Sequence, residues 1–152
     1  MSLTESLYGY LAQAVFHLLA IAGIGPQVHR CCVTQEELNP NFYDPSWCVG
    51  FSFDAGGLIN FRIKDREKNS DPPVVLPIIN QRLKATELTL LQHLNKSSLP
   101  HPGKIFPATI LDRNFTVPWL KVEHLLRNYA EYQLGRSFRS VTIIDSLPST
   151  EF

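Results

Sequence analysis

The longest hydrophobic stretch of the chain runs from Leu7 to Gly25, where 19 consecutive residues carry no formal charge. Apolar side chains in this stretch would fall on every face of a helix, which is typical of a helix buried in a protein core or spanning a membrane. Such a helix would reach about 28 Å, which is close to the thickness of a bilayer. However, Gln13 and His17 lie near its centre, and no Lys or Arg precedes Arg30 to orient insertion. We therefore expect a helix sequestered by protein, and neither a membrane partner nor a secretory signal.

Two runs of alternating apolar and polar residues, Trp47 to Phe53 and Leu58 to Lys64, flank the turn-forming residues 54–57 (DAGG). Two such runs around a short connection that contains glycine predict an antiparallel β-hairpin. Each arm has one apolar face, and we expect this face to cover the uncharged helix. The segments Gln27 to Thr34 and Ser140 to Ile144 are rich in strand-forming residues and predict further strands of the same sheet.

Leucines at helical spacing predict a helix near residues 86–96, with Thr86 as its N-cap. A second helix is predicted over residues 117–134, because Pro118 suits a first helical turn and Gly135 suits a helix end. Together these elements predict an α+β fold in a single domain, residues 1–152. In this fold the apolar N-terminal helix packs on an antiparallel sheet that contains the hairpin 47–64, and two further helices close the core.

The other segments predict loops and short extended elements. Lys64 to Asp71 mixes both signs of charge, as exposed loops do. Val74 to Ile79 is apolar but contains Pro77, so it suits an edge strand or an extended entry segment. Ala108 to Leu111 predicts a short strand.

The charge of the chain is balanced overall but unevenly distributed. It has 14 basic and 14 acidic residues, hence a net charge of zero. Residues 1–50 contain one basic residue, Arg30, and four acidic ones, which gives −3 and leaves +3 for the remainder. A dedicated nucleic-acid-binding domain is usually strongly basic. The composition therefore argues against nucleic acid as a partner, although it allows a local basic patch.

Three cysteines, Cys31, Cys32 and Cys48, are too few and too irregularly placed for a disulfide framework. The chain lacks the spacing of histidines and cysteines that structural zinc sites use. We therefore expect an intracellular protein, cytoplasmic or, in a eukaryote, nuclear, with no metal and no cofactor.

Three polar residues are candidates for a ligand site, because they fall on apolar elements. His17 lies within the uncharged helix and must find a hydrogen-bond partner or water. His29 and Cys31 are two residues apart on a predicted strand and would share a face. They suggest one alternative function, a small-molecule-binding protein or enzyme with a pocket between the first helix and the sheet. The chain has no phosphate-binding glycine loop, nucleophile elbow or carboxylate pair, so we name no catalytic residue. The sequence leans against enzymatic activity but leaves it open, because many active sites assemble only in the fold.

Basic residues gather late in the chain, at Lys121, Arg127, Arg136 and Arg139. They suggest a second alternative function, weak nucleic-acid binding through phosphate contacts. Glu123 and Glu131 lie among them, and such mixed charge is more typical of a solvated helix face.

The leading hypothesis combines a hydrophobic content of 44% with the lack of any catalytic or metal motif. It is a non-catalytic protein–protein interaction or assembly module of an intracellular complex that is able to self-associate. We expect its partner to be another protein or a second copy of the chain, which would bind apolar surface on the first helix or a sheet edge.

Overall fold

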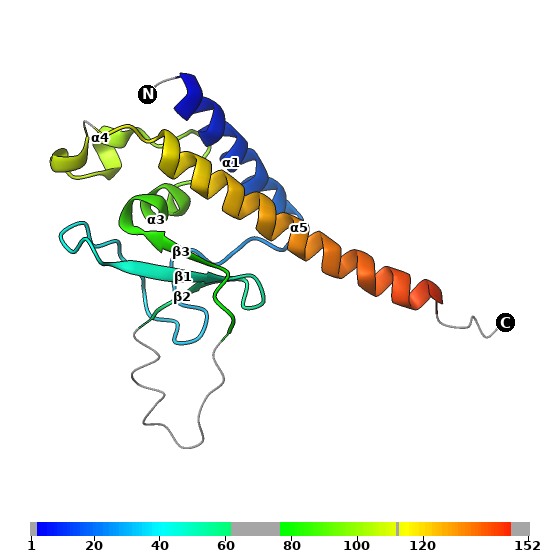
Figure 1. The fold of residues 1–152 in the computed structure, drawn as a ribbon. Coiled ribbons are helices and arrows are strands. Elements are labelled where there is room, and N and C mark those ends of the chain that lie inside the picture. The colour runs from blue at the N-terminus through cyan, green and yellow to red at the C-terminus, as the bar shows by residue number, and fades with distance from the viewer. Residues whose placement is uncertain (1–2, 62–76, 112, 147–152) are drawn as a thin grey trace, which may run out of the picture.

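A pair of long helices and a small sheet form the two sides of the molecule, with one short helix between them (Figure 1). The structure is a computed structural model, and it describes residues 3–61, 77–111 and 113–146. The predicted α+β fold class is confirmed. In chain order the elements are α1 (Leu3–Ile21), β1 (Cys48–Ser52), β2 (Gly57–Ile59), β3 (Gln81–Lys84), α3 (Ala85–Gln92), α4 (Pro102–Ile105), the 3-10 helix η1 (Ala108–Ile110) and α5 (Thr116–Ser146).

The sheet has three antiparallel strands in the order β2-β1-β3. The predicted hairpin is present but short, because its paired residues run from Gly50 with Ile59 to Ser52 with Gly57. Residues 62–64 of its predicted second arm lie outside the described residues. Side chains alternate along β1 and β3, so Val49, Phe51 and Leu83 enter the core. The opposite face, which we call the outer face, receives Cys48 and Gly50 together with their partners Lys84 and Arg82.

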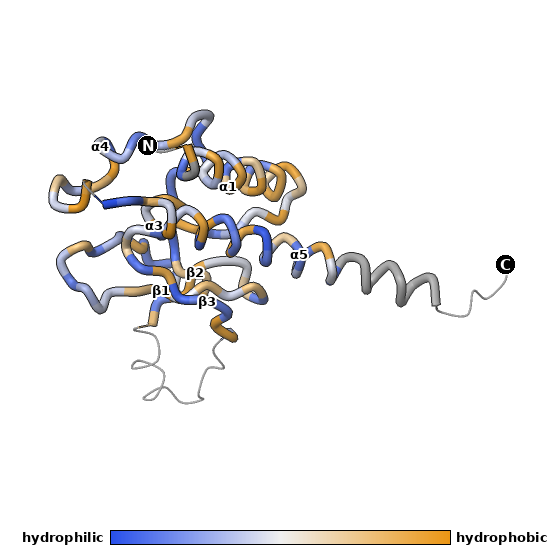
Figure 2. Tube along the Cα trace, turned by 45° about the horizontal axis from the view of Figure 1, so that its top comes forward, coloured by the Kyte–Doolittle hydropathy of each residue, from blue (hydrophilic) through white to orange (hydrophobic). Residues whose placement is uncertain are grey.

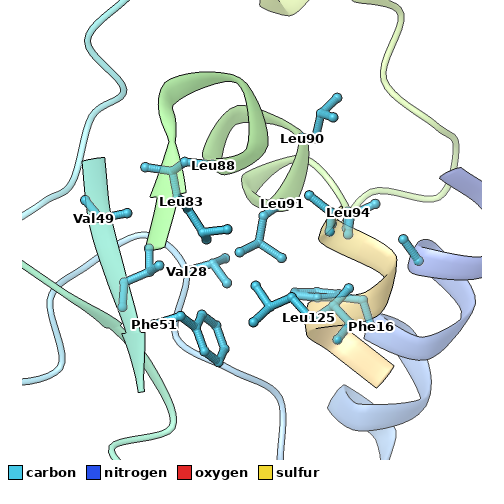
Figure 3. Close-up of a cluster of buried hydrophobic side chains, with 14 of the residues drawn as sticks. Phe16, Val28, Val49, Phe51, Leu83, Leu88, Leu90, Leu91, Leu94 and Leu125 are labelled. Carbon is cyan, nitrogen blue, oxygen red and sulfur yellow. The ribbon is translucent and has the colours of Figure 1, made fainter. Parts of the chain in front are cut away.

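The core lies where the helices meet the sheet (Figure 3). Phe51 of β1 and Leu83 of β3 point toward Leu91 of α3, and Leu125 of α5 and Phe16 of α1 complete the cluster. Trp119, Leu83 and Leu91 are at most 1% exposed. Burial of side chains of this size stabilises the fold by roughly 1.5–3 kcal/mol each before the entropy cost of ordering them.

Helix α1 packs along α5 rather than on the sheet, which differs from the expected partner (Figure 1). Its buried face includes Ala12, Phe16 and Leu19. The opposite face is exposed, with Leu18 at 65% and Ile21 at 83%, and Figure 2 shows apolar residues along the whole helix. A helix that is apolar all round does not reveal which face packs on the rest of the chain, and here only one face of α1 does so. Within the described residues, no helix combines the length and the apolar character that crossing a bilayer requires.

Three predicted strands are absent from the part of the chain that the structure describes. Residues 27–34 form only isolated bridges, from Gln27 to Gly57 and from Arg30 to Glu37. In the predicted strand 108–111, the first three residues instead form the 3-10 helix η1. Residues 140–144 belong to α5, which continues through Gly135 to Ser146, because an established helix extends residue by residue and overrides weak strand preference. Residues 64–71 and 74–76 lie outside the described residues.

Candidate functional site

The predicted ligand residues His17, His29 and Cys31 line none of the cavities of about 480, 300 and 190 Å³ that open on the described part of the chain. His17 lies 2.8 Å from the carbonyl oxygen of Leu94 through Nε2. A carbonyl only accepts hydrogen bonds, so Nε2 carries the proton and donates it. His17 therefore joins α1 to the end of α3, as does Gln13, which donates from Nε2 to the carbonyl of Lys96 at 2.9 Å. His29 is exposed, and Cys31 is fully buried.

The thiol of Cys31 lies among backbone amides. Burial pushes its pKa upward, but hydrogen bonds from the backbone N–H groups of Thr34 and Asn60 outweigh burial, and the net pKa is lowered. The N–H of Asn60 donates to Sγ at 3.3 Å. Cys31 thus ties residues 31–34 to the end of the hairpin. Among the described residues, no group of three or more His, Cys, Asp or Glu side chains is placed to hold a metal ion.

Two predicted basic residues of α5 form ion pairs with carboxylates that are largely buried. Nζ of Lys121 lies 3.1 Å from Oε1 of Glu87, and Nη2 of Arg127 lies 3.0 Å from Oε2 of Glu123. Both glutamates are nearly inaccessible, with side-chain exposures of 9% and 7%. A buried carboxylate needs such a partner. These two cations therefore stabilise the fold by neutralising Glu87 and Glu123.

The other two predicted basic residues lie further along α5. The guanidinium of Arg136 lies over the ring of Tyr132, 5.8 Å from its centroid. The hydroxyl of Tyr132 donates to the carboxylate of Asp54 in the hairpin turn, and this hydrogen bond raises the pKa of Tyr132. The side chain of Arg139 lies outside the described part of the structure.

A basic and aromatic surface that is absent from the sequence-based predictions covers the outer face of the sheet and the start of α3. Arg82 and Lys84 are exposed and point to the same side of β3, because they are two residues apart on a strand. The guanidinium of Arg82 lies 5.2 Å from the centre of the Phe61 ring. We call this region the β3–α3 surface, and define it by Trp47, Phe61, Arg82, Lys84 and Arg113.

Two of the open cavities lie on the β3–α3 surface, and residues of the loop 41–47 line both. The larger, of about 480 Å³, is lined by Trp47, Phe61 and Asn60, among others. The smaller, of about 190 Å³, is lined by Trp47, Lys84 and Arg113. Trp47 lines both cavities, so it is the aromatic side chain that the two have in common.

The smaller cavity has two cations, Lys84 and Arg113, against one carboxylate, Asp44, so its formal charge favours an anion. Among the described residues, no carboxylate lies within ion-pair distance of Arg82, Lys84 or Arg113. Two carboxylates, Glu37 and Asp44, line the larger cavity, and Asp44 lines the smaller one as well. Glu37 lies 3.6 Å from Arg30, and Asp44 accepts hydrogen bonds from the hydroxyl and amide of Ser46, which lower its pKa.

The sequence held one signal for this surface. Residues 81–84 read QRLK, in which one buried leucine lies between two basic residues, and this alternation is typical of a strand with a basic outer face. Arg113 and Trp47 carry no such signal, because they reach the surface from distant loops.

The chain is similar to several proteins described as DNA repair protein RecO. It is 47% identical to the protein of Gloeothece citriformis, 44% identical to that of Synechocystis sp. and 40% identical to that of a Nostoc sp.. These similarities cover 97%, 97% and 90% of this chain, and 54%, 52% and 50% of the relatives. The chain thus spans about half the length of these curated relatives. No protein-family model and no solved structure matches it.

This similarity overturns the leading hypothesis of a protein–protein interaction or assembly module, together with the expected protein partner or self-association. It also overturns the expectation that nucleic acid is not a partner. Of the hypotheses drawn from the sequence, the nucleic-acid alternative agrees best with it. A charge summed over the chain does not report how cations gather on one surface, so the zero net charge could not decide this point.

Proposed function

We propose that this chain is a RecO-type DNA repair protein, or the corresponding part of one, and that it binds DNA. The observation that carries the proposal is the 47% identity to a DNA repair protein RecO over 97% of the chain. A similarity of this extent includes the hairpin, α3 and α5, and so every candidate surface of the chain.

The distribution of charge supports the proposal. DNA binding depends mainly on cations that neutralise phosphates. The chain offers them on the β3–α3 surface through Arg82, Lys84 and Arg113, and on α5 through Arg127 and Arg136. Few cations on each surface suggest modest affinity with strong dependence on salt.

Binding of the wild-type chain to a fluorescently labelled oligonucleotide tests this function. Fluorescence anisotropy is measured for single-stranded and double-stranded DNA over a series of salt concentrations. We expect binding at low salt, with the logarithm of the binding constant falling linearly against the logarithm of salt concentration. If neither form of DNA binds even at the lowest salt, the proposed function is wrong.

A further inference from the structure

We infer that the β3–α3 surface, rather than the basic side of α5, is where this chain contacts DNA. The inference rests on the proposed function and assigns its site. Phosphates lie against Arg82, Lys84 and Arg113, and a base lies against Trp47.

The cations of this surface lie close together in space. Arg82 and Lys84 stand about 6.6 Å apart along β3, as expected for alternate residues of a strand. Lys84 and Arg113 line the same cavity although they are 29 positions apart in the sequence. Three exposed cations from two parts of the chain therefore lie on the β3–α3 surface, and two of them line one cavity.

The aromatic residues of the surface lie beside these cations. Trp47 lines both cavities and is only partly buried, and Phe61 lies between the larger cavity and Arg82. Proteins that hold nucleic-acid strands combine basic grooves with aromatic side chains on which bases stack. The amide side chains of Asn39 and Asn41 also line the larger cavity and offer donors and acceptors to a base edge.

Two of the basic residues of α5 differ from the cations of the β3–α3 surface, because carboxylates already hold them. Lys121 and Arg127 already pair with the buried carboxylates of Glu87 and Glu123. Moving either cation toward a phosphate would weaken the pairing of a buried charge, which is costly. Arg82 and Lys84 have no such pairing among the described residues, so binding a phosphate there breaks no ion pair that the structure shows.

Two double variants with the same loss of charge compare the surfaces. Arg82→Gln with Lys84→Gln removes two cations from the β3–α3 surface, and Arg127→Gln with Arg136→Gln removes two from α5. For single-stranded DNA we expect the first variant to lower the salt slope by about 1.4, at roughly 0.7 per lost phosphate contact. We expect the second to leave the slope unchanged. Equal effects, or a loss confined to the α5 variant, would overturn the inference.

Tryptophan fluorescence provides a second readout that does not depend on charge. The chain has two tryptophans, Trp47 and Trp119, and Trp119 is only 1% exposed. We expect DNA to quench the emission of the wild-type chain. Trp47→Phe should keep binding but lose the quenching, whereas Trp47→Leu should weaken binding roughly fivefold to hundredfold. Quenching that persists in Trp47→Phe contradicts the assignment.

The substitution Asp44→Asn should change DNA affinity in the opposite direction from the loss of a cation. The asparagine oxygen can still accept the hydrogen bonds from Ser46, so the loop should keep its conformation. Loss of the negative charge beside Trp47 should tighten DNA binding at low salt. Unchanged affinity would count against the β3–α3 surface. Wild-type binding in the same assay separates this result from failure of the proposed function itself.

Discussion

At the scale of single residues, Gly57 has the tightest surroundings of the hairpin. Its φ of +158° lies at the edge of the region that favours glycine, and a Cβ there would approach the carbonyl oxygen of Gln27 to 2.3 Å. That backbone is held in place by a hydrogen bond from the N–H of Leu58 to the same oxygen. We predict that Gly57→Ala lowers the free energy of unfolding by roughly 2–4 kcal/mol, measured by urea denaturation.

Gly135 provides the matched control for this prediction. It lies inside α5, and no described atom comes within 4 Å of a Cβ built there. Gly135→Ala should therefore stabilise the chain by about 0.5–1 kcal/mol, because alanine favours a helix. Equal effects of the two substitutions would show that the close approach at Gly57 is not formed.

The hydrogen bond from Tyr132 to Asp54 predicts a specific titration. It raises the pKa of Tyr132 above the ordinary value of 10.0. The unfolded chain then loses this proton first, so the bond stabilises the fold below pH 10.0 and its contribution is lost as the pH rises through the folded-state pKa. We predict that Asp54→Ala lowers the pKa of Tyr132, observed by NMR of its ring carbon. Asp44→Asn should leave that pKa unchanged, and a shift common to both variants would exclude the bond as the cause.

The sequence predicts that some side chains need a partner, but it does not always predict which partner they have. A histidine in an uncharged helix must have a partner, and His17 has one in Leu94. Which atom serves as partner depends on the packing of α1 against the end of α3, and no local pattern carries that information. The carboxylate of Glu87 that Lys121 meets is likewise visible only in the fold, whereas Glu123 and Arg127 are four residues apart on one helix and could be paired from the sequence.

At the scale of elements, Glu5 joins the first helix to the last. Its side chain is 6% exposed, and Oε1 accepts a hydrogen bond from the N–H of Phe115 at 2.6 Å, one residue before α5 begins. We predict that Glu5→Ala lowers the free energy of unfolding by about 1–3 kcal/mol, because it leaves a buried amide without its acceptor. Glu5→Gln keeps an acceptor oxygen and should cost less. The same cost for both variants, in chemical denaturation, would contradict this role.

Turn residues and apolar spacing made some helices and strands predictable from the sequence, whereas other elements could not be predicted. The hairpin follows from its glycine-containing turn, and α3 and α5 follow from their apolar spacing. The partner of α1 could not be predicted, because apolar residues on all of its faces fit the sheet and α5 equally well. Residues 27–34 have strand-forming side chains, but they form bridges and turns around the hairpin instead of a ladder.

At the scale of the whole molecule, the candidate site exists only after folding. Trp47 and Arg113 come from loops 66 positions apart, and they meet at the cavity beside Lys84. Sequence patterns point instead to basic residues that are close together along the chain, on α5. The α5 site stays a prediction, and the two double variants distinguish it from the β3–α3 surface.

Hydrogen–deuterium exchange with and without a single-stranded oligonucleotide tests the central claim most directly, because it reports every segment at once. We predict slower exchange in residues 41–47 and 79–86 when DNA is bound at low salt. Residues 120–136 of α5 should show no change. Protection confined to α5, or DNA binding without protection of either loop or strand, would contradict the assignment of the β3–α3 surface.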